Sequence, residues 1–329
     1  MPFSHILGQD TALITLKRAL CTGRVHHAYR FEGPDGVGKE MAAFALAQAL
    51  VCTSGDPLGC GTCDSCRRAI TLADDRPRVP IHPDVRIVER GLYPPDTIGQ
   101  RTEETRDISV NQIRTVVLAN AQFPPHEGRA RVFIVRAAEE MSIGAANAIL
   151  KTLEEPRRGT HFILLTARPD RLLPTIRSRT LPLRFAPLSD EIVAGILTGR
   201  GVPKERQDLA IDLAAGSASA AISLTDAEES AARDTFIQSA LTSVSAQSLG
   251  NAVMFAESGD RNKDALRGHL RALAAVLARE ARAAVSDKPV VASRAAARYS
   301  AVQQAIVQLD RNASPVLVVT SLVSEMQRV

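Results

Sequence analysis

The stretch Gly33-Pro34-Asp35-Gly36-Val37-Gly38-Lys39-Glu40 constrains the fold of this chain more than any other feature. A strand-like run, residues 28–32, precedes it, and an alanine-rich, helix-like run, residues 41–50, follows it. The spacing Gly-x4-Gly-Lys is typical of a phosphate-binding loop, in which backbone N–H groups face an anion and the lysine reaches the outer phosphates. The candidate nucleotide-binding residues are Gly33, Gly36, Gly38 and Lys39.

The residue after the lysine departs from this pattern. A working loop carries Ser or Thr there, because the hydroxyl ligates Mg²⁺. This chain has Glu40, whose carboxylate repels a triphosphate. The sequence therefore argues against bound Mg²⁺ and leaves ATP binding by this loop an open question.

A second candidate site is a group of cysteines. Four of the five cysteines, Cys52, Cys60, Cys63 and Cys66, fall between residues 52 and 66. Two C-x2-C steps among Gly and Pro residues can wrap one ion tetrahedrally, through thiolates at about 2.3 Å. In a cytosolic protein such spacing favours a metal over disulfides. We predict a structural Zn²⁺ site that has no open position for catalysis.

The order of apolar runs indicates the architecture. Strand-like runs at 28–32, 85–88, 132–135, 162–166 and 181–185 alternate with helix-like segments. Such alternation predicts a parallel sheet covered on both faces, with ligands at the carboxyl ends of its strands. We expect an α/β domain over 1–186 with the cysteine insert at 52–66, a small helical domain over 187–226 and an all-helical domain over 227–329.

Charge and hydropathy set bounds on partners. The net charge of +4 permits a nucleic-acid partner without requiring one. No apolar run approaches the length of about 18 residues that suits a membrane span, and no signal-peptide pattern is evident. We therefore expect a cytoplasmic protein without a membrane partner. The stretch Arg267–Arg282 carries a basic face, which is either solvated or a docking surface for a partner or DNA.

Several motifs together resemble one known family. Phe3–Gln9, His27-Ala28-Tyr29, the phosphate loop and the cysteine insert occur in the order seen in bacterial clamp-loader subunits, and residues 147–156 and 173–179 match two further motifs. The resemblance covers residues 1–225. It implies an AAA+ fold, in which an α/β ATPase domain precedes a helical lid and a helical collar that joins subunits into a ring. Such a ring places a sliding clamp on primer–template DNA for the replicative polymerase.

Within that family, the residues favour a subunit that does not hydrolyse ATP, the delta-prime type. An acidic pair should follow the strand 132–135 to hold Mg²⁺ and position water, but Arg136-Ala137-Ala138 stand there. We expect Glu139 and Glu140 to fall on the following helix. The family's lid arginine, expected shortly after Gly216-Ser217, is also missing.

The pair Ser178-Arg179 matches the family's arginine finger, followed by Thr180 where the family usually has Cys. In the family this arginine reaches a neighbouring subunit's ATP and stabilises the transferred phosphoryl group. The resemblance thus implies a catalytic role in trans for Arg179 and Ser178, although Arg179 could also form an ordinary salt bridge. The implied partners are ATPase subunits of gamma/tau type, the clamp-opening delta subunit and, through the complex, the sliding clamp and primer–template DNA.

Two other functions stay open at this point. One is an active, ATP-hydrolysing motor subunit of gamma/tau type from the same loader. The other is a stand-alone zinc-dependent DNA-binding protein. The latter is less favoured, because Asp56 and Asp64 but no Lys or Arg lie between Cys52 and Cys66.

Overall fold

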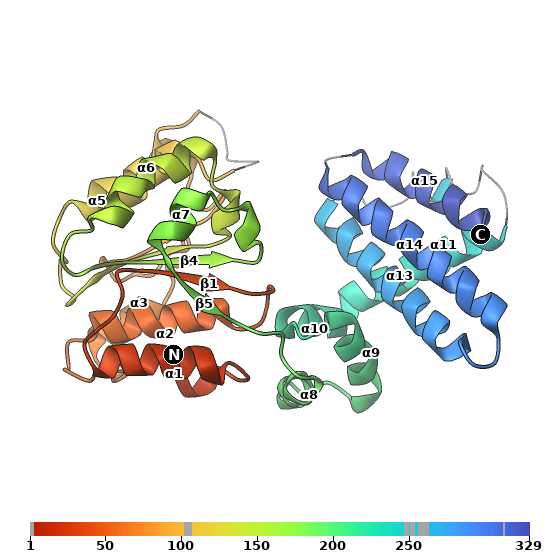
Figure 1. Ribbon diagram of the computed structural model, residues 1–329, viewed down its shortest axis with the longest axis horizontal. Helices are drawn as coiled ribbons and strands as arrows, with labels where there is room; N and C mark the ends of the chain where they lie inside the picture. Colours follow the sequence, from red (N-terminus) through yellow and green to blue (C-terminus); the bar gives the residue numbers. More distant parts are fainter. Residues whose placement is uncertain (1–2, 102–106, 247–249, 251–253, 256–262, 312) are drawn as a thin grey trace. The chain divides into compact units, whose positions relative to one another are not determined.

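The computed structural model describes residues 3–101, 107–246, 250, 254–255, 263–311 and 313–329 (Figure 1). The chain divides into two compact units, one of residues 1–192 with 216–219 and the other of residues 193–215 with 220–329. Each unit is described by itself. The division into three domains at residues 186 and 226 stays a prediction.

A five-stranded sheet forms the centre of the first unit, in the order β2-β3-β4-β1-β5. Every strand pairs with its neighbour in parallel, as the apolar runs predict. The central strands β3 and β4 are buried along almost their whole length, which explains why they lack alternation of polar and apolar residues. The strands are β1 (Ala28–Glu32), β2 (Val85–Val88), β3 (Arg131–Val135), β4 (Thr160–Thr166) and β5 (Leu181–Arg184).

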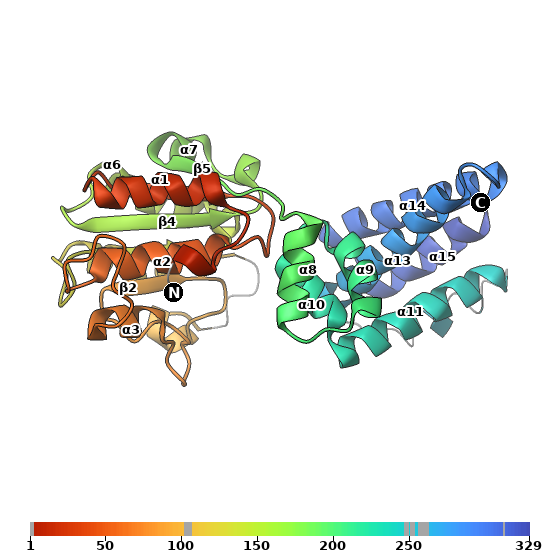
Figure 2. The same cartoon turned by 90° about the horizontal axis from the view of Figure 1, so that it is seen from below.

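Helices cover both faces of the sheet (Figures 1 and 2). One face carries α1 (Asp10–Cys21) and α2 (Lys39–Val51), and α3 (Asp64–Ile70) packs against α2. Helix α2 is apolar all round and almost wholly buried, as expected of an interior helix. The elements of the opposite face include a continuous helical run with a π-helical centre, made of α4 (Val110–Gln112), η3 (Ile113–Leu118) and α5 (Ala119–Ala121), together with α6 (Ile143–Glu154) and α7 (Pro174–Arg179).

The core on the α6 and α7 side is built from aromatic and aliphatic residues. The rings of Phe133 and Phe162, on adjacent strands, stack with their centroids 5.3 Å apart. Ile149 of α6 and Ile176 of α7 join the same buried cluster. Short 3₁₀ turns complete this unit: η1 (Phe3–His5), η2 (Pro95–Ile98), η4 (Ala138–Glu140) and η5 (Pro169–Arg171).

The described part of the second unit is helical, in agreement with the expectation from sequence. Leu273 and Leu277 of α13 pack in one buried cluster with Val302 of α14 and Leu322 of α15. On the basic face, Arg267 is paired with Asp310, with 3.0 Å between Nε and Oδ1. None of the described helices combines the length and apolar character needed to cross a membrane. The helices are α8 (Asp190–Gly199), α9 (Lys204–Ala214), α10 (Ala218–Thr225), α11 (Ala227–Ser245), α13 (Lys263–Ala284), α14 (Pro289–Asp310) and α15 (Pro315–Gln327), of which α8 and α10 begin in the first unit.

Candidate functional site

The phosphate loop lies between the carboxyl end of β1 and the start of α2, as its sequence predicts. Its lysine is turned inward: Lys39 Nζ donates to the carbonyl oxygens of Gly33 at 2.5 Å and Pro34 at 2.6 Å. Burial lowers the pKa of Lys39, and the nearby carboxylates of Asp35 and Glu139 oppose that shift. The ammonium group is therefore satisfied by the loop's own carbonyls.

Residues 217–219 of the chain pack against the phosphate loop at Gly36. The carbonyl oxygen of Gly36 accepts a hydrogen bond from Ala218 N at 3.0 Å. A Cβ added at Gly36 would collide with the hydroxyl oxygens of Ser217 and Ser219. Gly36 also has a left-handed φ of 74°. The close approach that only glycine permits is used here by the chain's own serines.

The glutamine of the first motif also contacts the loop. Gln9 Nε2 donates to the carbonyl oxygens of Val37 at 3.1 Å and Ala186 at 2.7 Å, and Gln9 Oε1 accepts from Ala186 N at 3.0 Å. Gln9 is buried, with 4% of its surface exposed. It therefore ties the loop to the segment that follows β5, a structural task that the motif alone does not reveal.

Arg136 occupies the region from which an active site would hold Mg²⁺. It directly follows β3, and its guanidinium forms ion pairs with Glu40 of α2 and with Glu89 after β2. The Nη1–Oε2 distance to Glu89 is 2.6 Å. Burial alone would lower the pKa of Arg136, but the two carboxylates outweigh it and raise that pKa. A fixed cation already balances these carboxylates, so a Mg²⁺ ion does not fit among them.

Glu139 and Glu140 lie on the helical element that follows β3, as predicted, but this element is a short 3₁₀ turn separate from α6. Both residues lie in η4, directly after β3, whereas α6 begins only at Ile143. Ala137 adopts a left-handed φ of 43°, which turns the chain into this separate 3₁₀ turn. Glu139 Oε1 accepts from Ala167 N at 3.1 Å, so its carboxylate stays close to the carboxyl ends of the strands.

Arg179 is the last residue of α7 and its side chain is 29% exposed. It forms an ion pair with Glu154, the last residue of α6, and Nε donates to Oε1 at 2.7 Å. Nη1 donates to Thr175 O at 3.0 Å and to Ser178 Oγ at 3.2 Å. The Ser178 hydroxyl thus helps to hold the Arg179 side chain in this position. The salt bridge considered from sequence exists within this chain, and the role of Arg179 in trans stays a prediction.

The sheet register separates Arg179 from the phosphate loop. Arg179 precedes the first residue of β5, Leu181, which pairs with Tyr29 near the start of β1. The loop begins at Gly33, beyond the other end of β1. At about 3.3 Å per residue, the five residues of β1 place the two sites about 17 Å apart. In this fold the guanidinium therefore cannot serve a phosphate held in its own loop.

The four predicted metal ligands come together in one cluster. Their Sγ atoms all lie within 4.8 Å of one another. The separation is 3.8 Å between Cys52 and Cys60, 3.9 Å between Cys60 and Cys66, and 4.0 Å between Cys52 and Cys63. A tetrahedron with metal–sulfur bonds of about 2.3 Å has edges of about 3.8 Å. These four residues can hold Zn²⁺, and their spacing is too wide for disulfides.

Backbone amides prepare two of these thiols for ionisation. Cys63 N and Cys66 N lie 3.3 Å and 3.5 Å from Cys60 Sγ and Cys63 Sγ. A hydrogen bond from Ser54, helped by backbone amides, lowers the pKa of Cys60 to about 5. For Cys63, burial opposes ionisation but amide hydrogen bonds outweigh it and lower the pKa. Burial raises the pKa of Cys66. A bound cation would reverse that last shift.

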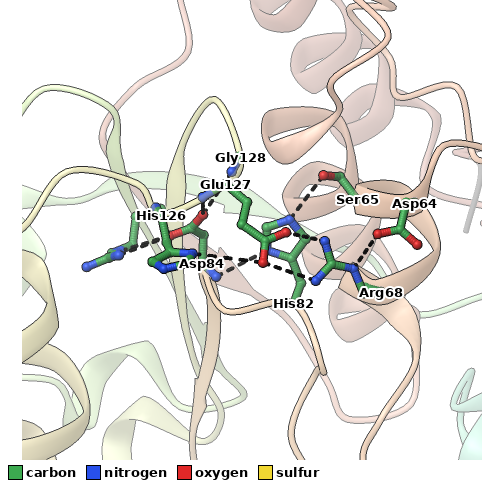
Figure 3. A network of polar contacts seen from close by, with 9 residues as sticks. Asp64, Ser65, Arg68, His82, Asp84, His126, Glu127 and Gly128 are labelled. Carbon is green, nitrogen blue, oxygen red and sulfur yellow. Dashed lines mark hydrogen bonds and ion pairs between the residues drawn. The ribbon is translucent and has the colours of Figure 1, made fainter.

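The sequence did not point to the carboxylate of Asp84, which is connected to the cysteine insert at 52–66. Asp84, which is fully buried, accepts from the backbone N–H groups of His126 at 2.6 Å, Glu127 at 2.8 Å and Gly128 at 2.9 Å (Figure 3). It also accepts from Arg131 Nε at 3.2 Å and Nη2 at 3.0 Å. Burial raises the pKa of Asp84, but these donors outweigh burial and lower it. A lone aspartate before a strand gives no local signal of this role.

Further contacts connect this carboxylate to α3, which carries Cys66. His82 Nδ1 accepts from Asp84 N at 3.1 Å, so its Nε2 carries the hydrogen and faces Ser65 Oγ at 3.3 Å. Arg68 of α3 forms ion pairs with Asp64 and with Glu127 (Figure 3). The network therefore links α3, which carries Cys66, to the turn at residues 126–128 that precedes β3.

Comparison with known proteins agrees with these observations. The family described as "DNA polymerase III, delta subunit" matches residues 8–189. The chain is 34% identical to DNA polymerase III subunit tau of Escherichia coli over 236 residues, 68% of this chain and 32% of that protein. It is 35% identical to subunit delta' of Pseudomonas aeruginosa over 195 residues, 58% of this chain and 53% of that protein.

The chain thus spans about a third of the tau relative and about half of the delta' relative. A solved DNA polymerase III gamma subunit-related protein of Thermotoga maritima has a TM-score of 0.52, covering 96% of this chain and 98% of its own. At 15% identity it supports the fold alone. The parallel sheet, the phosphate loop and the match over 8–189 lead to one conclusion. The chain belongs to the DNA polymerase III delta-subunit family of clamp-loader proteins, which take part in DNA replication and have the AAA+ fold.

Proposed function

We propose that this chain is a non-hydrolysing, delta-prime-type subunit of a bacterial clamp loader. The observation that carries the proposal is the guanidinium of Arg136 between Glu40 and Glu89, where an active subunit would hold Mg²⁺. The inward-turned Lys39 and the serines packed on Gly36 support the same conclusion. A loop arranged in this way shapes the turn between β1 and α2 rather than catalysing hydrolysis.

In this proposal Arg179 acts on ATP held by a neighbouring subunit. It is partly exposed and lies at the opposite end of β1 from its own loop. An arginine that stabilises charge on the transferred phosphoryl group in trans contributes about 10³–10⁵ in rate. The proposed partners are gamma/tau-type ATPase subunits, the delta subunit and, through the complex, the sliding clamp and primer–template DNA, all in the cytoplasm. A structural Zn²⁺ ion at the four cysteines completes the proposal.

The test is ATP hydrolysis by a reconstituted loader that contains Arg179→Ala. We expect a large loss of clamp- and DNA-stimulated turnover, because the neighbour's site loses its transition-state cation. Arg177→Ala is the matched control, since it removes an exposed arginine from the same helix. Undiminished turnover with Arg179→Ala, or an equal loss with Arg177→Ala, would show that Arg179 is not the finger.

An active motor subunit of gamma/tau type is the second candidate. It is favoured by the similarity to tau and by Glu139, whose charge acts on Lys39 from η4. Equilibrium dialysis of the isolated chain with Mg·ATP separates the two functions. Tight binding with turnover identifies a motor subunit, whereas the non-hydrolysing proposal expects no turnover.

A further inference from the structure

Arg30 is a charged residue in the interior of the sheet. It lies in the middle of β1 and only 6% of its surface is exposed. Alternate residues of a strand share a face, so Arg30 lies on the same face as Ala28, which belongs to the core cluster of α6 and α7. Burying a guanidinium in such a layer is unfavourable unless its donors find acceptors. Its partners therefore indicate what it does.

Two of the partners of Arg30 lie at the C-terminal end of α7, one in its last turn and one directly after it. Nη1 donates to Arg177 O at 2.9 Å and to Thr180 Oγ1 at 2.7 Å. Nε donates to Glu32 Oε1 at 2.6 Å, so the buried charge is balanced within β1. Carbonyls in the last turn of a helix have no partner within the helix, and Arg30 supplies one to Arg177.

The hydroxyl of Thr180 links Arg30 to a second carbonyl at the end of α7. It is 5% exposed, and its hydroxyl donates to Ile176 O at 2.9 Å while accepting from Arg30. Arg30 and Thr180 therefore bind two consecutive carbonyls of the turn that ends in Arg179. We call this pair of residues the α7 clamp.

We propose that the α7 clamp positions Arg179 for its action in trans, so that Arg30 and Thr180 are positioning residues; this inference rests on the proposed function. Arg179 lies between Arg177 and Thr180, and the clamp fixes the backbone on both sides of it. The side chain itself contacts Glu154 and Thr175 within this chain, and the clamp acts on the backbone from which it extends. A displacement of about 1 Å at a reacting group can cost about a hundredfold in rate, so the hold on this turn matters.

Thr180→Val tests the clamp with little change in shape. It removes both hydrogen bonds of the hydroxyl, whereas Thr180→Ser keeps them. In a reconstituted loader with ATPase subunits, clamp and primed DNA, we expect Thr180→Val to lower kcat about tenfold to a hundredfold with KM for ATP unchanged. Thr180→Ser should stay near the unaltered protein. Assembly is followed by size-exclusion chromatography, and folding by the melting temperature of the chain.

A double-mutant cycle separates this inference from the proposed function. If Thr180 acts only through Arg179, Thr180→Val has no further effect on kcat in an Arg179→Ala loader. An equal effect in both backgrounds, or no effect in either, overturns the clamp while the finger stands. If Arg179→Ala itself leaves kcat unchanged, the proposed function fails and the clamp with it.

A second variant covers the case in which Thr180→Val does not fold. Arg30→Lys keeps a charge beside Glu32, but one amino nitrogen cannot reach Glu32, Arg177 O and Thr180 together as the guanidinium fork does. The same loss of kcat and the same dependence on Arg179 are expected. A loader whose kcat is unchanged by Arg30→Lys contradicts the clamp.

Discussion

Replacing Arg136 with Met removes the cation beside the phosphate loop and keeps most of the side-chain volume. Arg136 is 21% exposed, and its partners Glu40 and Glu89 are 48% and 41% exposed. Ion pairs with that much solvent contribute about 0.2–1 kcal/mol each, so the loss of both should destabilise the first unit by about 0.4–2 kcal/mol. For a domain of this size each kcal/mol lowers Tm by about 2–4 °C.

The sharper consequence is a new response to Mg²⁺. Without Arg136 the carboxylates of Glu40 and Glu89 lack their cation, and oxygen ligands of this kind attract Mg²⁺. At a Mg²⁺ concentration about ten times Kd, binding stabilises the folded form by about 1.4 kcal/mol. Scanning calorimetry should show that Mg²⁺ raises the Tm of Arg136→Met and leaves the unaltered protein unchanged.

The control is the double variant Arg136→Met with Glu40→Gln, which removes one of the two carboxylates and should lose the response. An equal rise in Tm with Mg²⁺ in the unaltered protein would refute the reasoning, because it would mean that Arg136 leaves room for the metal.

Three further outcomes are expected. Chelation of zinc, or Cys66→Ser, should lower the Tm of the first unit, because the four cysteines hold the segment at 52–66 together through the ion; equal Tm values with and without metal would contradict a structural Zn²⁺ site. Asp84→Asn should cost about 3–5 kcal/mol in denaturant unfolding, because it leaves the buried Arg131 guanidinium without its counter-charge. Since the folded pKa of Asp84 is lowered, its stabilisation is present above the unfolded pKa of about 3.9 and is lost as pH falls through the folded value. Acid unfolding of the unaltered protein and of Asp84→Asn checks this dependence. Glu154→Gln should raise loader kcat by at most about fivefold, because Arg179 must break its ion pair with Glu154 before it reaches a phosphate. A fall of kcat to the value of the Arg179→Ala loader would contradict this requirement.

The secondary structure of the first unit could be predicted closely, because its signals are local. β1 and β2 have the predicted bounds, and β5 ends at Arg184, one residue earlier than expected. The cysteine cluster was also predictable, because its ligands are close in sequence and their spacing is specific to metal sites. The exception is η4, where a left-handed Ala137 creates a turn that residue preferences do not favour.

The contacts on which the proposals rest could not be predicted, because they join residues far apart in the chain. Arg136 meets Glu40 across 96 positions, and Arg30 meets Thr180 across 150. Both pairs depend on the strand order, which brings β1 beside β4 and β5, and on side-chain conformations that a periodic pattern does not specify. The sequence shows that Glu40 and Arg136 replace expected residues, but only the structure shows that they bind each other.

The central claim is that this chain contributes an arginine to a neighbour's site and no hydrolysis at its own loop. The most direct test compares Lys39→Met with Arg179→Ala in otherwise identical reconstituted loaders, with equal assembly confirmed for both. The account predicts that Lys39→Met leaves the stimulated ATPase rate unchanged and that Arg179→Ala lowers it by orders of magnitude. A loader that loses activity with Lys39→Met and keeps it with Arg179→Ala would contradict the account.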